Sequence, residues 1–354
     1  MISIGLIGAG RIASVHAQHL KNHPFARLVA VTDPVAARAD AIAAEHGARV
    51  FPDAEAIIAA HDIDAVIIAS STETHCPLML AAVRAGKKVY CEKPLASTLA
   101  EAHRTLIELG EQQQQVMVGF NRRFDRNHAA IQTDITQGRL GRVQTVQITS
   151  RGPNGIPSLE YLRVSGGLFY DKMIHFFDLV RWLTGEEVTD IAAFGSVIAD
   201  PLFLDANDVD TAMVTLRTAS GALCQIDNAR RAVYGYDDRI EVFGTSGLAE
   251  SSRITEGSVM RIFDDKVLTE GLPKDPMIRM APSYAAAIQA FTVFVRHAGT
   301  PEAISVPGVY DGLRAQMMAE AATRAAAERR IVSLAEIEAE IPSPTDVIKP
   351  RRIK

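Results

Sequence analysis

Short apolar runs alternate with amphipathic segments along the first 120 residues. Buried strands are predicted at 2–7, 28–32, 64–69, 88–91 and 116–120. Helical periodicity between most of these runs places an amphipathic helix after each strand. Strands that alternate with helices at short spacing indicate a parallel sheet covered on both faces. The N-terminal part is therefore expected to be a doubly wound α/β domain.

The second half of the chain carries β-branched runs instead, at 143–149, 192–198, 211–218, 222–227, 239–243 and 259–263. Ser220-Gly221 and Ser246-Gly247 are typical of hairpin turns, so a mainly antiparallel open sheet with helices on one face is expected. An Ala-rich helix at 309–329 is expected to pack back on the first domain. The predicted domains are 1–121 and an α+β domain at 122–341, followed by a loose C-terminal tail at 342–354.

One apolar segment of the second domain carries titratable side chains at helical spacing. Residues 166–185 begin with two glycines, end with a third and contain no proline, which predicts a buried helix. Asp171, His175, Asp178 and Trp182 would share one face of that helix. Because an unpaired charge is costly in a core, this face must meet a cleft or a buried partner. Two interpretations stay open: a proton-transfer site in which Asp171 holds the His175 ring, or a satisfied core Asp–His pair.

A glycine-containing turn joins the first predicted strand to the first helix. Its residues are Gly8, Ala9, Gly10, Arg11, Ile12 and Ala13. Asp33 ends the second strand, where a ribose would lie. This arrangement predicts a Rossmann-type dinucleotide site, in which backbone and helix N-terminus approach the pyrophosphate and Asp33 binds the ribose hydroxyls. A carboxylate at this position would repel a 2′-phosphate, so NAD is expected rather than NADP.

Two further strand ends are expected near the nicotinamide half of the cofactor. A polar loop at 70–75 follows the strand 64–69, at the carboxyl edge where open sheets bind ligands. Glu92-Lys93-Pro94 follows the strand 88–91, and the proline gives Lys93 a stiff neighbour. The candidate cofactor contacts at these ends are Ser70, Ser71, Thr72, His75, Glu92 and Lys93.

Composition narrows the choice of partners. The chain has 354 residues, of which 47% are hydrophobic and 22% charged, as in ordinary globular proteins. Its net charge of −5 argues against a nucleic-acid or anionic-membrane partner. No apolar run approaches the roughly 18 residues of a membrane span, and the first residues form a strand rather than a signal peptide. Three widely spaced cysteines predict reduced thiols in a cytoplasmic protein without a structural metal.

Taken in order, these motifs resemble the Gfo/Idh/MocA oxidoreductases over nearly the whole chain. The residues that carry the resemblance are the glycine turn with Asp33, Glu92-Lys93-Pro94, and Asp171 with His175. Residues 119–125, 150–153 and 161–167 are most similar to the inositol 2-dehydrogenases of that family. The resemblance implies Lys93, Asp171 and His175 as the catalytic set. It also implies a homotetramer, and substrate contacts from this set and from Arg123, Arg151, Tyr234 and Tyr236.

The expected activity is NAD-dependent oxidation of a secondary hydroxyl of a cyclic polyol to a ketone. Gly152 and Phe176 stand where inositol enzymes usually carry Asp or Asn and an acidic residue, so a pyranose sugar is an alternative substrate. A non-catalytic NAD-binding regulator and an NAD-dependent glycosidase are further alternatives. Residues 152–159 are expected to form a lid.

Overall fold

The computed structural model describes residues 1–153, 157–297 and 305–341, which divide into two compact units. Of the described residues, the first unit contains those within Met1–Asn121, Ser283–Gln316 and 339–341. The second contains Arg122–Pro282 and Met317–Glu338. The second domain was expected to be continuous from 122 to 341, but Ser283–Gln316 joins the first unit instead. The predicted tail at 342–354 lies outside the described residues.

The first unit is built on a six-stranded parallel sheet with the strand order β3-β2-β1-β4-β5-β6. Its strands are β1 Ile2–Ile7, β2 Ala26–Thr32, β3 Arg49–Val50, β4 Ala65–Ile68, β5 Lys88–Cys91 and β6 Val116–Val118. From β1 the chain adds β2 and β3 on one side, and it then returns to add β4, β5 and β6 on the other side. The point between β1 and β4 is therefore the topological switch point, where open sheets of this kind bind ligands. The predicted doubly wound α/β fold is confirmed.

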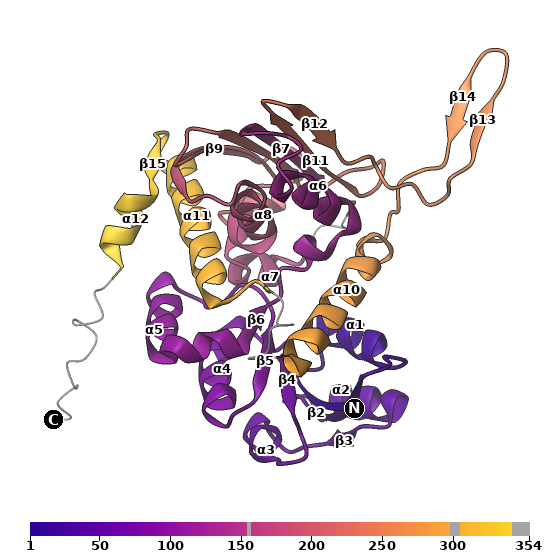
Figure 1. Cartoon of the computed structure of the whole chain (residues 1–354), viewed down its shortest axis with the longest axis vertical. Helices are drawn as coiled ribbons and strands as arrows, with labels where there is room; N and C mark the ends of the chain where they lie inside the picture. Colours follow the sequence, from indigo (N-terminus) through magenta and orange to yellow (C-terminus); the bar gives the residue numbers. More distant parts are fainter. Residues whose placement is uncertain (154–156, 298–304, 342–354) are drawn as a thin grey trace. The chain divides into compact units, whose positions relative to one another are not determined.

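Helices cover both faces of this sheet (Figure 1). They are α1 Arg11–Leu20, α2 Ala36–His46, α3 Ala54–Ala59, α4 His75–Arg84 and α5 Leu99–Leu109, with 3-10 turns η1 Thr72–Thr74 and η2 Gly110–Gln115. Helix α1 contacts α2, whereas α3 contacts α4 and α4 contacts α5. Residues Ala13, His16, Ala17 and Leu20 form the buried face of α1, at the spacing that an amphipathic helix requires.

Two C-terminal helices, α10 Pro276–Arg296 and α11 Val309–Glu328, pass from one unit to the other. In the first unit, the Phe291 ring meets the edge of Tyr90 at 5.6 Å, and the Gln316 side chain bonds the backbone of Ala96 at both its oxygen and its nitrogen. In the second unit, the Tyr170 hydroxyl donates to Glu320 at 2.7 Å. The helix at 309–329 was expected to belong to the second domain and to pack back on the first; its residues up to Gln316 belong to the first unit and those from Met317 to the second. Such long-range contacts leave no periodic signal in the sequence.

The second unit contains a seven-stranded sheet with the order β12-β11-β7-β10-β9-β8-β15. Its strands are β7 Val143–Arg151, β8 Val188–Ser196, β9 Thr211–Thr218, β10 Leu223–Ala229, β11 Asp237–Gly244, β12 Gly247–Glu250 and β15 Val332–Ser333. Only the β7–β10 pair is parallel, so the predicted mainly antiparallel sheet is confirmed. Helices α6 Arg126–Thr136 and α8 Ile174–Thr184 lie on one face (Figure 1).

Smaller elements complete the second unit: η3 Asn121–Phe124, α7 Leu159–Val164, η4 Phe169–Met173, α9 Leu202–Asp205, α12 Leu334–Glu340, β13 Met260–Ile262 and β14 Val267–Thr269. The predicted strand at 259–263 is shorter and pairs only with β14, outside the main sheet. Every residue of this hairpin is exposed, so no buried face fixes it to the sheet.

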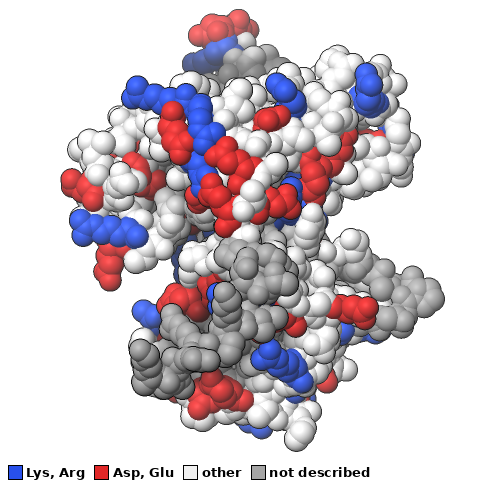
Figure 2. Space-filling model, turned by 90° about the vertical axis from the view of Figure 1, so that its left-hand side faces the viewer, with Lys and Arg blue, Asp and Glu red and all other residues white. Residues whose placement is uncertain are grey.

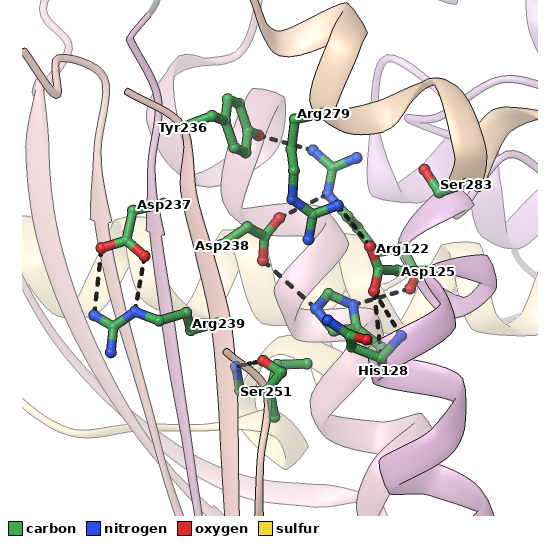
Figure 3. A network of polar contacts seen from close by, with 12 residues as sticks. Arg122, Asp125, His128, Tyr236, Asp237, Asp238, Arg239, Ser251, Arg279 and Ser283 are labelled. Carbon is green, nitrogen blue, oxygen red and sulfur yellow. Dashed lines mark hydrogen bonds and ion pairs between the residues drawn. The ribbon is translucent and has the colours of Figure 1, made fainter. Parts of the chain in front are cut away.

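A buried polar network lies between α6, β11 and α10 (Figure 3). The Arg122 guanidinium donates to the Tyr236 hydroxyl at 2.9 Å and pairs with Asp238 at 3.2 Å. Arg279 donates to Asp125 at 2.6 Å, and both side chains are almost fully buried. Each of these buried arginines thus lies next to a carboxylate of opposite charge, as a buried charge requires.

Asp125 also caps α6. Its Oδ1 accepts hydrogen bonds from the backbone N–H of Asn127 and His128. Burial opposes the charged carboxylate, but His128, Arg279 and the backbone bond together hold the pKa of Asp125 below its usual value. The anion therefore satisfies both a helix N-terminus and a buried arginine.

Charges of both signs are interspersed on the face shown in Figure 2, in keeping with the small net charge of −5. No helix within the described ranges is long and apolar enough to cross a membrane. Within the same ranges, no group of three His, Cys, Asp or Glu side chains is arranged to hold a metal ion.

Replacing Asp125 tests the network against an exposed pair on the same helix. Asp125→Ala should lower the free energy of unfolding by about 3–5 kcal/mol, because it leaves buried Arg279 without this carboxylate and removes the N-cap of α6. Asp134→Ala, which breaks the exposed Asp134–Arg139 pair, should cost under about 1 kcal/mol. Chemical denaturation of both variants provides the measurement, and equal losses would show that the network adds no stability of its own.

Candidate active site

The glycine turn between β1 and α1 leaves backbone exposed where a phosphate would bind. Gly8 has a φ of +95°, and a Cβ there would lie 2.7 Å from the backbone of Ala69 and Ser70, so only glycine fits. Gly10 is the N-cap of α1, and nothing lies within 4 Å of the place its Cβ would take. Arg11 and Ile12 begin the helix, whose N-terminal N–H groups favour an anion.

Asp33 follows β2 and faces the same turn. Its Oδ2 accepts the Ala9 N–H at 2.7 Å, and its Oδ1 accepts the Val35 N–H at 2.8 Å. These bonds fix the carboxylate while each oxygen keeps a further lone pair for a ribose hydroxyl. The residues present therefore fit the adenosine half of a dinucleotide.

The polar loop after β4 is held by its own side chains. The Ser70 and Thr74 hydroxyls are 2.6 Å apart, and Thr74 donates to the Ser71 carbonyl at 2.7 Å, at the 3-10 turn that Thr72 begins. Burial lowers the pKa of His75, which favours the neutral ring with a single N–H. Its shorter contact is from Nδ1 to the Pro94 carbonyl, at 2.8 Å. His75 thus ties this loop to the segment that carries Lys93.

Glu92 and Lys93 follow β5 at the same edge of the sheet. Glu92 is buried, and its Oε1 lies 2.8 Å from Nε2 of His16 on α1. Its Oε2 accepts the backbone N–H of Lys93 at 3.3 Å. The glycine turn, Asp33, the loop after β4 and Lys93 all follow carboxyl ends of neighbouring strands, so the sheet topology brings the predicted cofactor residues to one edge.

In the second unit, the segment predicted as a single helix at 166–185 is not a regular α-helix over its whole length. The turn η4 that carries Asp171 is π-helical, and regular α-helix begins only at Ile174 and ends at the left-handed Gly185. Gly167 has a φ of +79°, and a Cβ there would approach Asp208 to 2.8 Å. Asp171 and His175 are therefore not separated by one regular α-helical turn, as the spacing had suggested. Wider turns of this kind are frequent at functional sites.

Asp171 is held by two side chains that the sequence analysis did not single out as its partners. The Tyr161 hydroxyl donates to its Oδ1 at 2.9 Å, and Arg230 donates to its Oδ2 at 2.9 Å. Arg230 is buried and also donates to Asp208 at 3.1 Å. Arg230 follows β10, far along the chain, and no local pattern indicates its partner. The two hydrogen bonds thus fix the orientation of the Asp171 carboxylate.

The two remaining residues of the predicted helix face, Asp178 and Trp182, contact Arg123. Asp178 is fully buried and accepts from Arg123 at 2.7 and 2.5 Å, and the Arg123 guanidinium lies 6.0 Å from the Trp182 ring. His175, in the first turn of α8, is also buried. This bidentate pair gives Arg123 a fixed orientation, and its role at the substrate stays a prediction.

The remaining predicted substrate residues are placed by strand alternation. Ser150 is buried on the helix-covered face, so Arg151 points to the other face, where it pairs with Asp227. Tyr234 donates to Asp237 at 3.0 Å, and Figure 3 shows Asp237 on the opposite side of β11 from Asp238. Tyr236 is buried in the polar network. Their roles in substrate binding stay predictions.

Phe176 and Gly152 were expected at the wall of the substrate site, where inositol enzymes usually carry polar side chains. Phe176 is buried in the core, so it does not form part of an exposed wall. The Gly152 N–H donates to the Ala229 carbonyl at 3.0 Å, which anchors the start of the predicted lid. Residues 154–156 of that lid lie outside the described residues.

Lys172 is a further candidate that the sequence analysis missed. Its Nζ donates to the Ala229 carbonyl at 3.3 Å, next to the strand end that precedes Arg230. Burial, followed by the charges of Arg230 and Arg122, lowers the pKa of Lys172 to about 7, against the opposing effect of Asp171. A lysine within a titratable segment is the only sequence signal that could have drawn attention to it.

The glycine turn and Asp33 on a doubly wound sheet define a dinucleotide-binding α/β domain, and a second unit with a mainly antiparallel sheet follows it, as in dinucleotide-dependent oxidoreductases. Comparison with family models agrees. Residues 2–120 match the oxidoreductase family with an NAD-binding Rossmann fold, and residues 128–250 match the GFO/IDH/MocA C-terminal domain. The chain belongs to the GFO/IDH/MocA oxidoreductases. The predicted family and NAD cofactor are confirmed.

Relatives cover nearly the full chain. An inositol 2-dehydrogenase of Rhizobium meliloti is 41% identical over 94% of this chain and 99% of its own length. A myo-inositol 2-dehydrogenase of Thermotoga maritima is 40% identical over 94% and 99%, respectively. The structure of a scyllo-inositol dehydrogenase of Lactobacillus casei, with NAD(H) and scyllo-inositol bound, superposes with a TM-score of 0.86 at 27% identity and covers 95% of this chain and 99% of that one.

Lys172→Met should stabilise the protein, and more so at lower pH. The folded pKa of about 7 lies below the ordinary value of 10.5, so between these values the unfolded chain binds more protons and wild-type stability rises with pH. The variant should therefore melt higher than wild type by roughly 2–4 °C or more near pH 6.5, with the gap closing toward pH 10. Melting curves at several pH values test this. Lys266→Met, at an exposed lysine, is the control, and a gap independent of pH would contradict the assignment.

Proposed function

We propose that this protein oxidises a secondary hydroxyl of a cyclic, inositol-like polyol to a ketone with NAD as hydride acceptor. The observation that carries the proposal is the presence in one chain of the Asp33 carboxylate at the glycine turn and the fixed Asp171 carboxylate before His175. Near full-length similarity to inositol dehydrogenases supports the choice of substrate class.

NAD supplies the hydride acceptor when bound, and the protein handles the proton. His175 accepts the hydroxyl proton, because a neutral imidazole is the side chain best suited to do so near neutral pH. Asp171, held by Tyr161 and Arg230, favours the imidazolium that results. The positive charge of Lys93 orients the alcohol and stabilises alkoxide character in the transition state.

A pyranose sugar is the second candidate substrate, because Gly152 offers no carboxylate or amide side chain where inositol enzymes usually carry one. A non-catalytic regulator is disfavoured because Lys93, Asp171 and His175 are all present. An NAD-dependent glycosidase would use the same hydride step to eliminate a sugar substituent.

The protein is proposed to act as a homotetramer in the cytoplasm. Phe194, Met213, Leu223 and Phe243 are exposed on the strands of the seven-stranded sheet. Phe194 pairs in register with Met213, so apolar side chains gather on the face away from the helices. A second copy of the chain is a suitable cover for such a face. The three free cysteines fit a reducing compartment.

A substrate panel tests the proposed function directly. Inositol stereoisomers, pyranose sugars and aryl glycosides are incubated with NAD while NADH absorbance is followed. Oxidation of at least one inositol is the expected result. Release of an aryl group without net NADH would identify a glycosidase. NAD binding without turnover of any compound would favour the non-catalytic regulator.

Asp33→Ser should erode the preference for NAD over NADP by about ten- to a hundredfold. The carboxylate makes charge-assisted bonds to a ribose diol and repels a 2′-phosphate, and serine does neither. Dissociation constants of both nucleotides, measured by fluorescence titration, give the ratio. Tighter binding of NADP than NAD by the wild-type protein would refute this assignment of Asp33.

His175→Ala should lose about a hundred- to ten-thousandfold in turnover, the usual worth of a positioned general base. Wild-type oxidation should fall at acid pH as the histidine is protonated. Asp171→Asn should do less harm and move the acid limb to lower pH, because the imidazolium loses its partner. The pH dependence of kcat is measured for all three proteins, with NAD affinity checked separately. Near-normal turnover of His175→Ala with an unchanged acid limb would make the helix structural.

A further inference from the structure

A buried histidine joins two parts of the first unit that the cofactor prediction treats separately. His16 lies on α1, one helical turn beyond the glycine turn, and is completely buried. Its Nε2 is 2.8 Å from Oε1 of Glu92, which follows β5 and precedes Lys93. A carboxylate only accepts hydrogen bonds, so Nε2 carries the proton and donates it.

Packing alone does not explain a histidine at this position. The ring makes edge contacts with Tyr90 at 5.0 Å and Tyr284 at 5.7 Å, which an apolar side chain could also make. Its other nitrogen, Nδ1, is buried and has no hydrogen-bond partner among the described residues. Burying a polar atom without a hydrogen-bond partner is unfavourable. The hydrogen bond to Glu92 is the contact that only a donor can provide.

The Glu92 side chain that bonds His16 also bonds the backbone of Lys93. Its second oxygen accepts the Lys93 N–H at 3.3 Å. Gly119, at the end of β6, leaves the room that this carboxylate fills, because a Cβ there would lie 2.9 Å from Oε2. The Gly119 N–H in turn donates to the Cys91 carbonyl at 2.7 Å. The start of the Lys93 segment is therefore enclosed by β5, β6 and α1.

We propose that His16 is a positioning residue for Lys93. By holding the Glu92 carboxylate in one orientation, it fixes the backbone from which Lys93 extends. It also links this backbone to α1, whose N-terminus carries the phosphate-binding turn. The inference rests on the role of Lys93 in the proposed function. Displacement of a catalytic group by about 1 Å can cost on the order of a hundredfold in rate, so a single hydrogen bond at this place matters for turnover.

The test compares three substitutions on α1. His16→Leu removes the donor at similar volume, His16→Gln restores an N–H donor, and His19→Leu is the control at a partly exposed histidine of the same helix. His16→Leu should lower kcat by about ten- to a hundredfold while the NADH dissociation constant changes less than about threefold. His16→Gln should recover most of kcat. Hydrogen exchange at the Lys93 amide should quicken in His16→Leu alone.

Gly119→Ala provides a second variant should His16→Leu fail to fold, since it pushes on the same carboxylate from the other side. It should lower kcat and quicken exchange in the same way. Wild-type kcat and exchange in His16→Leu or Gly119→Ala would overturn the proposal, and so would equal losses in His16→Gln and His16→Leu. If the wild-type protein oxidises no polyol, the proposed function fails, and amide exchange still decides the role of His16.

Discussion

The placement of buried and partly buried carboxylates is the constraint on which the rest of this structure depends. A carboxylate removed from water must be paired or hydrogen-bonded, and each of those near the candidate site has a specific partner. Glu92 contacts His16, Asp171 contacts Tyr161 and Arg230, and Asp178 is paired with Arg123. Because these partners come from distant segments, satisfying the anions also fixes the backbone around them.

Charged side chains are paired on both faces of the sheet in the second unit. On the helix-covered face, Arg122 and Asp238 form a buried ion pair, and both charges influence the pKa of Lys172. On the other face, Arg151 pairs with Asp227 among exposed apolar side chains. Strand alternation thus places Arg151 and the Arg122–Asp238 pair on opposite faces of the sheet.

The nucleotide-binding half was predictable because its signals are local. A glycine turn between strand and helix, and an acid at the end of the next strand, are adjacent in sequence and in space. The segment that carries Asp171 and His175 was predictable as a helix with titratable residues, but its π-helical turn was not, because no local pattern signals it. Arg230 and His16 were not indicated as partners, since neither belongs to a motif.

By itself, the sequence determined the main strands and helices of the first domain, the parallel and mainly antiparallel sheets, the glycine turn and the family. These depend on periodicity and short spacing, which are properties of neighbouring residues. Only the tertiary structure decided that Ser283–Gln316 joins the first unit, that Phe176 is buried, and that Arg151 pairs with Asp227. Those outcomes depend on contacts between segments far apart in the chain, and a local pattern carries no information about which distant surface will cover it.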